Sequence, residues 1–149
     1  MEYSKFEVSI DASTEKVWDS LWSDANYPKW TNAFCEGSHA VTNWQEGSKV
    51  HFLDGNNSGM FAVIERNERE KFMSIKALGE VVNGNEIVDT EMAKACAGSY
   101  ENYTLTREGD KTHLLIELIA DTLPPEFKDF MDNAWPKALK ALKAVAESN

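Results

Sequence analysis

The chain has 149 residues, of which 42% are apolar and 27% are charged, a balance typical of a globular protein rather than a disordered one. Its 25 acidic and 15 basic residues give a formal net charge of −10, which argues against binding to nucleic acid and to anionic membrane surfaces. No run approaches ~18 consecutive apolar residues, so we expect no membrane insertion. No signal peptide is visible at the N-terminus, and we expect a cytoplasmic protein.

The residues that usually hold metals or cofactors are few and scattered. Cys35 and Cys96 are far apart in the sequence and form no CxxC motif, and we expect both to be reduced thiols. The segment Gly55–Gly59 lacks the lysine and the following helix of a phosphate-binding loop. No spacing suited to a metal site or a catalytic triad relates the three histidines, His39, His51 and His113. We therefore expect no metal and no cofactor.

The first part of the chain predicts one strand followed by short helices. Apolar and polar residues alternate along Tyr3–Ile10, which is the period of a half-buried strand. Ser13 is a suitable N-cap for a helix whose apolar residues fall at helical spacing over Val17–Leu21. A second short helix or turn is expected over Asp24–Trp30, interrupted near Pro28.

Short strands bounded by turn residues follow in the middle of the chain. One strand and two hairpins are predicted, at Val50–Leu53, at Gly59–Arg66 with Phe72–Leu78, and at Tyr100–Arg107 with Thr112–Ala120. Gly109-Asp110 is the expected turn of the last hairpin. The polar, acidic stretch Val82–Lys94 is interpreted as a long connection with room for a turn of helix.

The C-terminal segment predicts one long amphipathic helix. Leu123-Pro124-Pro125 ends the last strand and suits a helix start, because proline is tolerated in the first turn. Apolar residues then fall on one stripe over Glu126–Ser148. The order of elements predicts a single α+β domain over residues 1–149. We expect a curved antiparallel sheet of about six or seven strands wrapped around the C-terminal helix, with one or two short helices after the first strand.

Three segments carry a resemblance to a known superfamily. They are Ile10–Leu21 (IDASTEKVWDSL), Asn26–Thr31 (NYPKWT) and Ala134–Lys143 (AWPKALKALK). In this order they resemble the helix-grip superfamily, which includes START lipid-transfer domains, the birch-pollen-allergen fold and polyketide cyclases. The closest subgroup is the family named for the activator of the heat-shock-protein ATPase, although Thr14 stands where that family usually has proline. The resemblance implies a cavity between the concave face of the sheet and the last helix.

The expected turn at Gly109-Asp110 sets the register of the last hairpin. Counting outward from it pairs Glu108 with Lys111, Leu105 with Leu114, Tyr103 with Ile116 and Glu101 with Leu118. The apolar partners mark this face as the inner one. Glu101 then lies among apolar neighbours, where desolvation would raise its pKa and make it a possible general base or polar anchor. The alternative is a carboxylate that is hydrated at the cavity mouth or paired with a lysine or arginine.

The register and the helix stripe predict a lining for the cavity that the resemblance implies. The candidate ligand-binding residues are Trp30, Trp44, Phe52, Ile75, Glu101, Tyr103, Leu105, Ile116, Leu118, Phe127, Met131 and Trp135. For the aromatic members, ordinary core packing is the alternative. Trp18 and Trp22 are assigned to packing.

Three functions are open at this point. The first is binding of a small apolar or amphipathic molecule, such as a lipid, an aromatic or a polyketide-like compound. The second is a cyclase or dehydratase that uses Glu101 as general base and Tyr103 to orient the substrate. The third, a chaperone partner, is suggested by the family name alone, and the namesake's activity involves a further domain. The sequence favours a binding protein over an enzyme and leaves the oligomeric state open between monomer and dimer.

Overall fold

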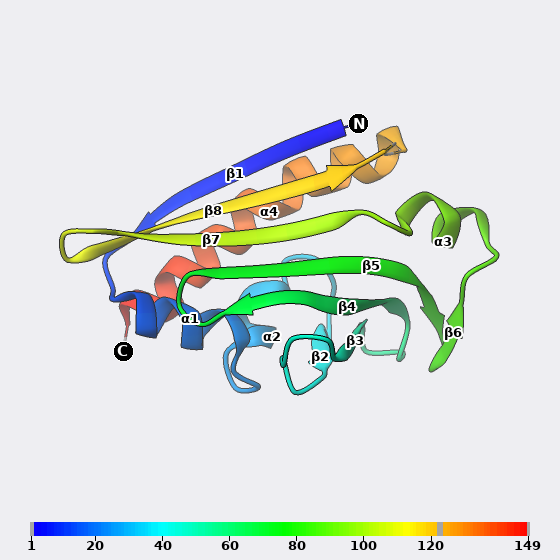
Figure 1. Cartoon of the computed structure of the whole chain (residues 1–149), viewed down its shortest axis with the longest axis horizontal. Coiled ribbons are helices and arrows are strands. Elements are labelled where there is room, and N and C mark those ends of the chain that lie inside the picture. Colours follow the sequence, from blue (N-terminus) through cyan, green and yellow to red (C-terminus); the bar gives the residue numbers. More distant parts are fainter. Residues whose placement is uncertain (1, 122–123, 149) are drawn as a thin grey trace.

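The computed structural model describes residues 2–121 and 124–148 (Figure 1). The chain begins with β1 (Glu2–Ile10), which is followed by α1 (Thr14–Trp22) and α2 (Tyr27–Thr31). One strand followed by two short helices is the order that the sequence predicts. Leu123, which the sequence places at the end of the last strand, lies outside the described residues.

An antiparallel sheet forms the main layer of the molecule. Within the described residues it has eight strands, with the spatial order β1-β8-β7-β5-β4-β3-β2 and with β6 beside β5. The strands after β1 are β2 (His39–Val41), β3 (Lys49–Leu53), β4 (Gly59–Glu68), β5 (Phe72–Val82), β6 (Asn85–Ile87), β7 (Tyr100–Glu108) and β8 (Lys111–Ala120). The predicted α+β class is confirmed. The sheet has more strands than expected because β2 and β6, with three residues each, are too short to show a period.

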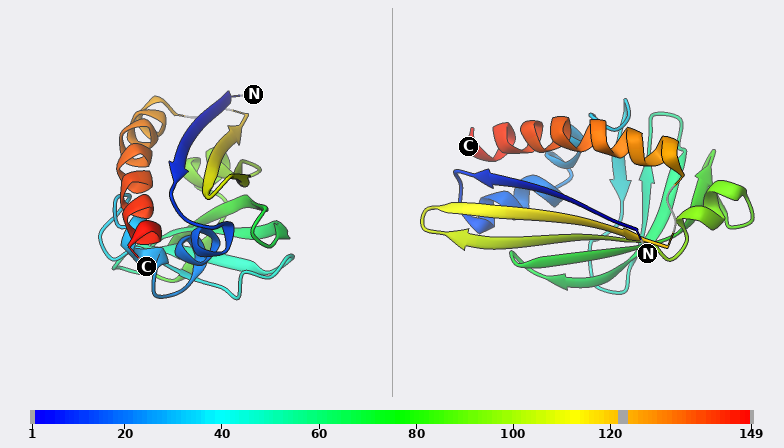
Figure 2. Two further views of the ribbon diagram at one scale, coloured as in Figure 1. Left: turned by 90° about the vertical axis from the view of Figure 1, so that its left-hand side faces the viewer. Right: turned by 90° about the horizontal axis from the view of Figure 1, so that it is seen from above.

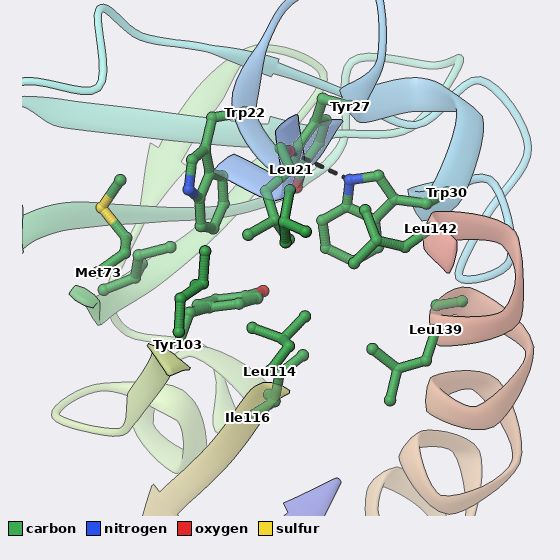
Figure 3. Packing of buried hydrophobic residues seen from close by; sticks show 14 of the residues in the cluster. Leu21, Trp22, Tyr27, Trp30, Met73, Tyr103, Leu114, Ile116, Leu139 and Leu142 are labelled. Atoms are coloured by element: carbon green, nitrogen blue, oxygen red, sulfur yellow. Dashed lines mark hydrogen bonds between the residues drawn. The ribbon is translucent and has the colours of Figure 1, made fainter. Parts of the chain in front are cut away.

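The two short helices after β1 are fixed by side-chain hydrogen bonds. Ser13 Oγ accepts a hydrogen bond from the amide of Lys16 at 3.2 Å, which confirms the predicted N-cap. Pro28 lies in the first turn of α2, where no backbone N–H is needed, so the prediction that it interrupts this helix is wrong. Trp30 donates from Nε1 to the carbonyl oxygen of Leu21 at 3.1 Å, which joins α2 to α1 (Figure 3).

The segment between β5 and β7 forms more regular structure than the sequence indicates. It contains β6 and α3 (Glu91–Cys96), and α3 packs against β5. Thr90 caps α3 by accepting a hydrogen bond from the amide of Ala93 at 3.0 Å. In Figures 1 and 2, α3 lies at the end of the sheet where the C-terminal helix begins.

The β7–β8 hairpin has the predicted register. Gly109, in its two-residue turn, has φ +65°, a left-handed conformation that glycine adopts readily. The observed partners are Glu108–Lys111, Leu105–Leu114, Tyr103–Ile116 and Glu101–Leu118. The predicted inner face is also confirmed, because its apolar members and Tyr103 are at most 8% exposed.

Two irregularities in the β4–β5 ladder bend the sheet. The register shifts between Phe61 and Ala62, and again between Ile64 and Arg66. An extra residue on one strand of an antiparallel pair increases the local twist and bends the strand. The end view in Figure 2 shows the sheet curving around the C-terminal helix.

Helix α4 (Pro125–Glu147) lies on the concave side of the sheet and contacts β1, α1 and α2. Its two halves pack differently. The buried residues of α4 all lie between Ala134 and its C-terminal end and are Ala134, Trp135, Ala138, Leu139, Leu142 and Ala146. Part of the core that they complete is drawn in Figure 3. In the first half, Phe127 and Met131 are half-buried and Phe130 is 46% exposed.

Candidate functional site

A cavity of about 380 Å³ lies under the less packed half of α4. Its wall is formed by α4, α2 and the loop after it, the β3–β4 turn, the end of β5, α3 and the start of β7. A neighbouring cavity of about 100 Å³ shares six lining residues with it. Among the described residues, the wall of the larger cavity has eight aromatic side chains and three methionines. Its size and apolar lining are those of small-molecule binding sites.

Glu101 and Tyr103 form the polar centre of the cavity wall. They lie two residues apart on the same face of β7, and the hydroxyl of Tyr103 donates a hydrogen bond to Oε1 of Glu101. Glu101 is half-buried because part of its surface opens onto the cavity. Burial raises the pKa of Glu101, and the hydrogen bond from Tyr103 opposes this effect by stabilising the carboxylate. No lysine, arginine or histidine of the described residues forms an ion pair with Glu101.

Tyr27, the first residue of α2, brings a second phenol to this wall. Burial raises the pKa of Tyr27 well above its ordinary value, and the negative charge of Glu101 raises it further. Burial and the charge of Glu101 have the same effect on the pKa of Tyr103. Both phenols therefore keep their protons at neutral pH. A phenol can donate or accept a hydrogen bond, whereas an ionised carboxylate can only accept one.

Cys35 and Cys96 also line the larger cavity, and both are free thiols. Burial is the main cause that raises the pKa of each. A thiol with a raised pKa holds its proton at neutral pH and is a poor nucleophile. The two cysteines therefore contribute apolar surface to the wall.

Two further carboxylates lie in the wall at strand ends. Asp54 closes the β3–β4 turn, because its Oδ1 accepts hydrogen bonds from the amides of Asn56 at 2.7 Å and Ser58 at 3.1 Å. Glu80 joins β5 to the start of α3, because its Oε1 accepts a hydrogen bond from Oγ1 of Thr90 at 2.6 Å. Neither forms an ion pair with another residue of the described part of the chain.

None of the three histidines lines either of the two cavities. His51 Nε2 is 2.7 Å from Oε2 of Glu86, and His113 Nε2 is 3.0 Å from Oε1 of Glu7. His39 borders a separate hollow of about 290 Å³ at the outer side of α2 and β2. In residues 2–121 and 124–148, no three His, Cys, Asp or Glu side chains come close enough to hold a metal ion. No helix of this part of the chain is both long and apolar enough to cross a membrane.

Nine of the twelve predicted site residues line one of the two cavities. Trp30, Phe52, Tyr103 and Trp135 line the larger one, Ile75 and Leu118 line the smaller one, and Glu101, Phe127 and Met131 line both. Their role in binding a ligand stays a prediction.

The other three line neither of these two cavities, although Trp44 borders the hollow of about 290 Å³ beside α2 and β2. Leu105 and Ile116 face inward but belong to the packed core, where α1 lies against β7 and β8. Strand alternation gives the face of a residue, but it does not say how far along the strand a cavity extends. Trp44 lies in a loop with φ +60°, and its ring packs against those of Trp22 and Tyr27, with centroids 4.7 and 5.6 Å away.

Sequence reasoning missed several residues of the wall, among them Tyr27, Phe34, Met92 and Phe130. For Met92 a signal was present, because Thr90 followed by an acidic residue is typical of a helix start. For Phe130 the helical period was a signal, because it lies three residues after Phe127 and four before Ala134, a spacing that places all three near one face.

A curved sheet that holds a long C-terminal helix across a cavity defines a START-like helix-grip domain. The chain belongs to the family described as Activator of Hsp90 ATPase homolog 1-like protein, whose model matches residues 11–147. A comparison with curated proteins finds no match.

Solved structures with the same fold share little sequence with this chain. The protein MLL2253 from Mesorhizobium loti has a TM-score of 0.77 and 15% identity, with 99% of this chain and 98% of that chain covered. The Aha1 dimer from Colwellia psychrerythraea has a TM-score of 0.74 and 17% identity, with 99% and 97% covered. DynU16, from the dynemicin biosynthetic locus, has a TM-score of 0.75 and 14% identity, with 99% and 48% covered. At these identities the likeness establishes the fold.

Proposed function

We propose that this protein binds a small amphipathic molecule in the cavity between α4 and the sheet. The observation that carries the proposal is the cavity of about 380 Å³, whose aromatic and methionine-rich wall surrounds the hydrogen-bonded pair Glu101 and Tyr103. An apolar pocket with a few convergent polar groups is the usual form of a ligand-binding site. The origin of DynU16 in a biosynthetic locus is compatible with a small-molecule ligand.

The wall suggests how such a molecule would lie. Its apolar body would pack against Trp30 of α2 and against Phe127, Met131 and Trp135 of α4, since all four line the larger cavity. Its polar end would reach Glu101. Removing the apolar body from water supplies most of the binding free energy, and the polar contact fixes the orientation.

Native mass spectrometry of the protein, purified without denaturation, tests the proposal directly. We expect a co-purified small molecule, or a rise in Tm with at least one member of a panel of lipids and aromatic compounds. A ligand at about 100 times its Kd stabilises the folded state by about 2.7 kcal/mol, which a thermal-shift measurement detects easily. A native mass spectrum of the protein alone, with no bound molecule, together with an unchanged Tm across the panel, would contradict the proposal.

A pair of tryptophan substitutions on α4 locates the site. Met131→Trp adds a large ring at a residue that lines both cavities, so we expect the ligand-induced rise in Tm to be lost. Lys140→Trp adds the same ring at an exposed position of the same helix and should leave the rise in Tm unchanged. Binding that survives Met131→Trp with unaltered affinity would place the ligand elsewhere.

A second candidate function is an enzyme of the cyclase or dehydratase kind. The observation that favours it is Glu101, because burial raises the pKa of its carboxyl and the hydroxyl of Tyr103 holds the carboxylate in place. A carboxylate with a raised pKa is a stronger base than an ordinary one. Turnover of polyketide-like substrates by the wild type, and its loss in Glu101→Gln, is the expected result. Unchanged turnover in Glu101→Gln would exclude this mechanism.

The family description supports a third candidate, a chaperone partner. The measurement is the ATPase rate of a purified Hsp90-type chaperone with and without this protein, combined with a pull-down. A higher rate and recovery of the chaperone are expected if the candidate is right. An unchanged rate with no chaperone recovered would remove it.

A further inference from the structure

The charged side chains that line the two cavities all have the same sign. They are Asp54, Glu80 and Glu101, and no lysine, arginine or histidine is among the described lining residues. The elements around the cavity do carry basic residues, such as Lys94 on α3 and Lys128 on α4, but these are exposed and lie outside the wall. The wall is therefore acidic as well as apolar.

Glu101 lacks a positively charged partner within the described protein. Its neighbours across the two ladders are Ile75 on β5 and Leu118 on β8, both apolar, and its hydrogen bond comes from the neutral hydroxyl of Tyr103. Removing a carboxylate from water without a counter-charge costs free energy. A ligand that carries a positive charge would supply the counter-charge that the described side chains do not.

The aromatic rings next to Glu101 favour the same kind of ligand. Trp30, Tyr103 and Trp135 form one cluster in the wall, with ring centroids 6.0 to 6.5 Å apart, and Tyr103 connects this cluster to Glu101. Aromatic rings attract cations at their faces and pack equally well against apolar groups. The cluster thus accommodates both parts of a cationic amphiphile, and it supplies no positive charge to a carboxylate or a phosphate.

We propose that the ligand of this cavity is an organic amine, protonated and attached to an apolar body, and that its ammonium group pairs with Glu101. This inference rests on the proposed ligand-binding function. The net charge of −10 acts in the same direction at long range, because a cleft lined by one sign of charge concentrates ions of the opposite sign. Anionic amphiphiles such as fatty acids are disfavoured by the same three carboxylates.

Three probes with one carbon skeleton test this inference: phenylbutylamine, phenylbutanol and phenylbutanoate. Isothermal titration calorimetry at neutral pH and low salt measures the Kd of each for the full chain. We expect the amine to bind at least about tenfold more tightly than the alcohol, which corresponds to about 1.4 kcal/mol. We expect the carboxylate to bind most weakly.

Two matched variants identify the partner of the ammonium group. Glu101→Gln should lower the preference for the amine over the alcohol to about onefold, because it removes the charge that pairs with the ammonium group. Glu108→Gln removes the same charge from an exposed position of the same strand, so it should leave the preference intact. This control separates direct pairing from the long-range effect of net charge.

Each unfavourable outcome has a distinct meaning. Binding of the alcohol as tightly as the amine, or a preference for the amine that persists in Glu101→Gln, would overturn the inference. The binding function itself would stand, because the alcohol or the amine then occupies the protein. Failure of all three probes to bind would also overturn the inference, and the native mass spectrum of the purified protein would then decide the binding function separately.

Discussion

The two halves of α4 have very different surroundings. In the second half, Leu139 and Leu142 are at most 5% exposed and complete a core with α1, α2 and the sheet. In the first half, Phe127 and Met131 are half-buried over a cavity. Both halves are amphipathic, because a cavity wall and a packed core both require apolar side chains. The helical period alone therefore cannot separate a part of a helix that stabilises the fold from a part that leaves space.

The two ends also differ in their buried polar groups. Near α1, Thr112 is fully buried and donates from Oγ1 to the carbonyl oxygen of Ala12 at 2.8 Å, which satisfies both groups. At the cavity, Glu101 has a phenol as its side-chain partner and a raised pKa. Thr112 at the packed end therefore stabilises the fold, whereas Glu101 at the open end is held at some cost to stability.

Truncation of Leu142 should cause the largest loss of unfolding free energy. Leu142→Ala removes fully buried methyl groups and is expected to cost about 2–5 kcal/mol. Met131→Ala should cost much less, about 1 kcal/mol, since Met131 already borders empty space. Urea unfolding of both variants measures the difference. Equal losses of unfolding free energy would contradict the division of α4 into a packed half and an open half.

Replacement of Glu101 should have an intermediate effect on stability, and it should stabilise the fold rather than destabilise it. The folded state raises the pKa of Glu101, so the wild type loses stability as the pH rises from the unfolded value of about 4.3 through the folded pKa. Glu101→Gln removes this loss and keeps an oxygen that accepts the hydrogen bond from Tyr103. We expect a higher Tm at neutral pH, by roughly 2–4 °C for each kcal/mol gained, and no gain near pH 4.

Thermal unfolding of the wild type and Glu101→Gln over this range of pH checks that expectation. Glu108→Gln is the control, because Glu108 is exposed on the same strand and its replacement changes the net charge equally. A gain in Tm that is the same at every pH would show that ionisation of Glu101 is not its cause.

The smallest effects should come from two ion pairs on α4. Glu147 Oε2 lies 2.8 Å from Nζ of Lys143 and accepts a hydrogen bond from the amide of Asp11 at 2.7 Å, so it ties the packed end to the chain after β1. Lys128 and Asp132, 3.2 Å apart, join two positions of one helix. Glu147→Gln should lower the Tm by about 1–2 °C, whereas Asp132→Asn should leave it unchanged.

The effect of Glu147 should also depend on pH. Its hydrogen bonds with Lys143 and the amide of Asp11 lower the pKa of Glu147. The stability that it contributes is therefore present above the unfolded pKa and is lost as the pH falls through the folded pKa. Thermal unfolding of Glu147→Gln and the wild type at neutral pH and near pH 3 measures this. A difference in Tm that persists in acid would contradict the assignment.

The parts of the fold that depend on local information could be predicted from the sequence. The two-residue turn at Gly109 fixes the register of both strands beside it, and the direction of Glu101 followed from that count. The partner of Glu101 on its other side, Ile75, could not be obtained in this way. The chain between β5 and β7 folds into β6 and α3 before it rejoins the sheet as β7. The polar sequence of this segment does not determine the register in which β7 then pairs with β5.

The limits of the cavity were not predictable, because they depend on how far the helices cover the sheet. Leu105 and Tyr103 share one face of β7, but α1 packs over the part of the sheet that holds Leu105, and the cavity begins at Tyr103. Trp44 could not be placed because its backbone has a positive φ, a state that a tryptophan rarely adopts and that no pattern of apolar residues indicates.

Trp30 and Trp135 give the cavity a built-in optical reporter. Both indoles line its wall, with ring centroids 6.0 Å apart. Indole emission responds to the polarity of its surroundings and to nearby quenching groups. A molecule that enters the cavity should therefore change the fluorescence spectrum of the intact, unlabelled protein, and the change should weaken when Trp30 or Trp135 is replaced by phenylalanine. The fluorescence of these two tryptophans, which in the sequence are only large apolar residues, thus reports whether the cavity is occupied.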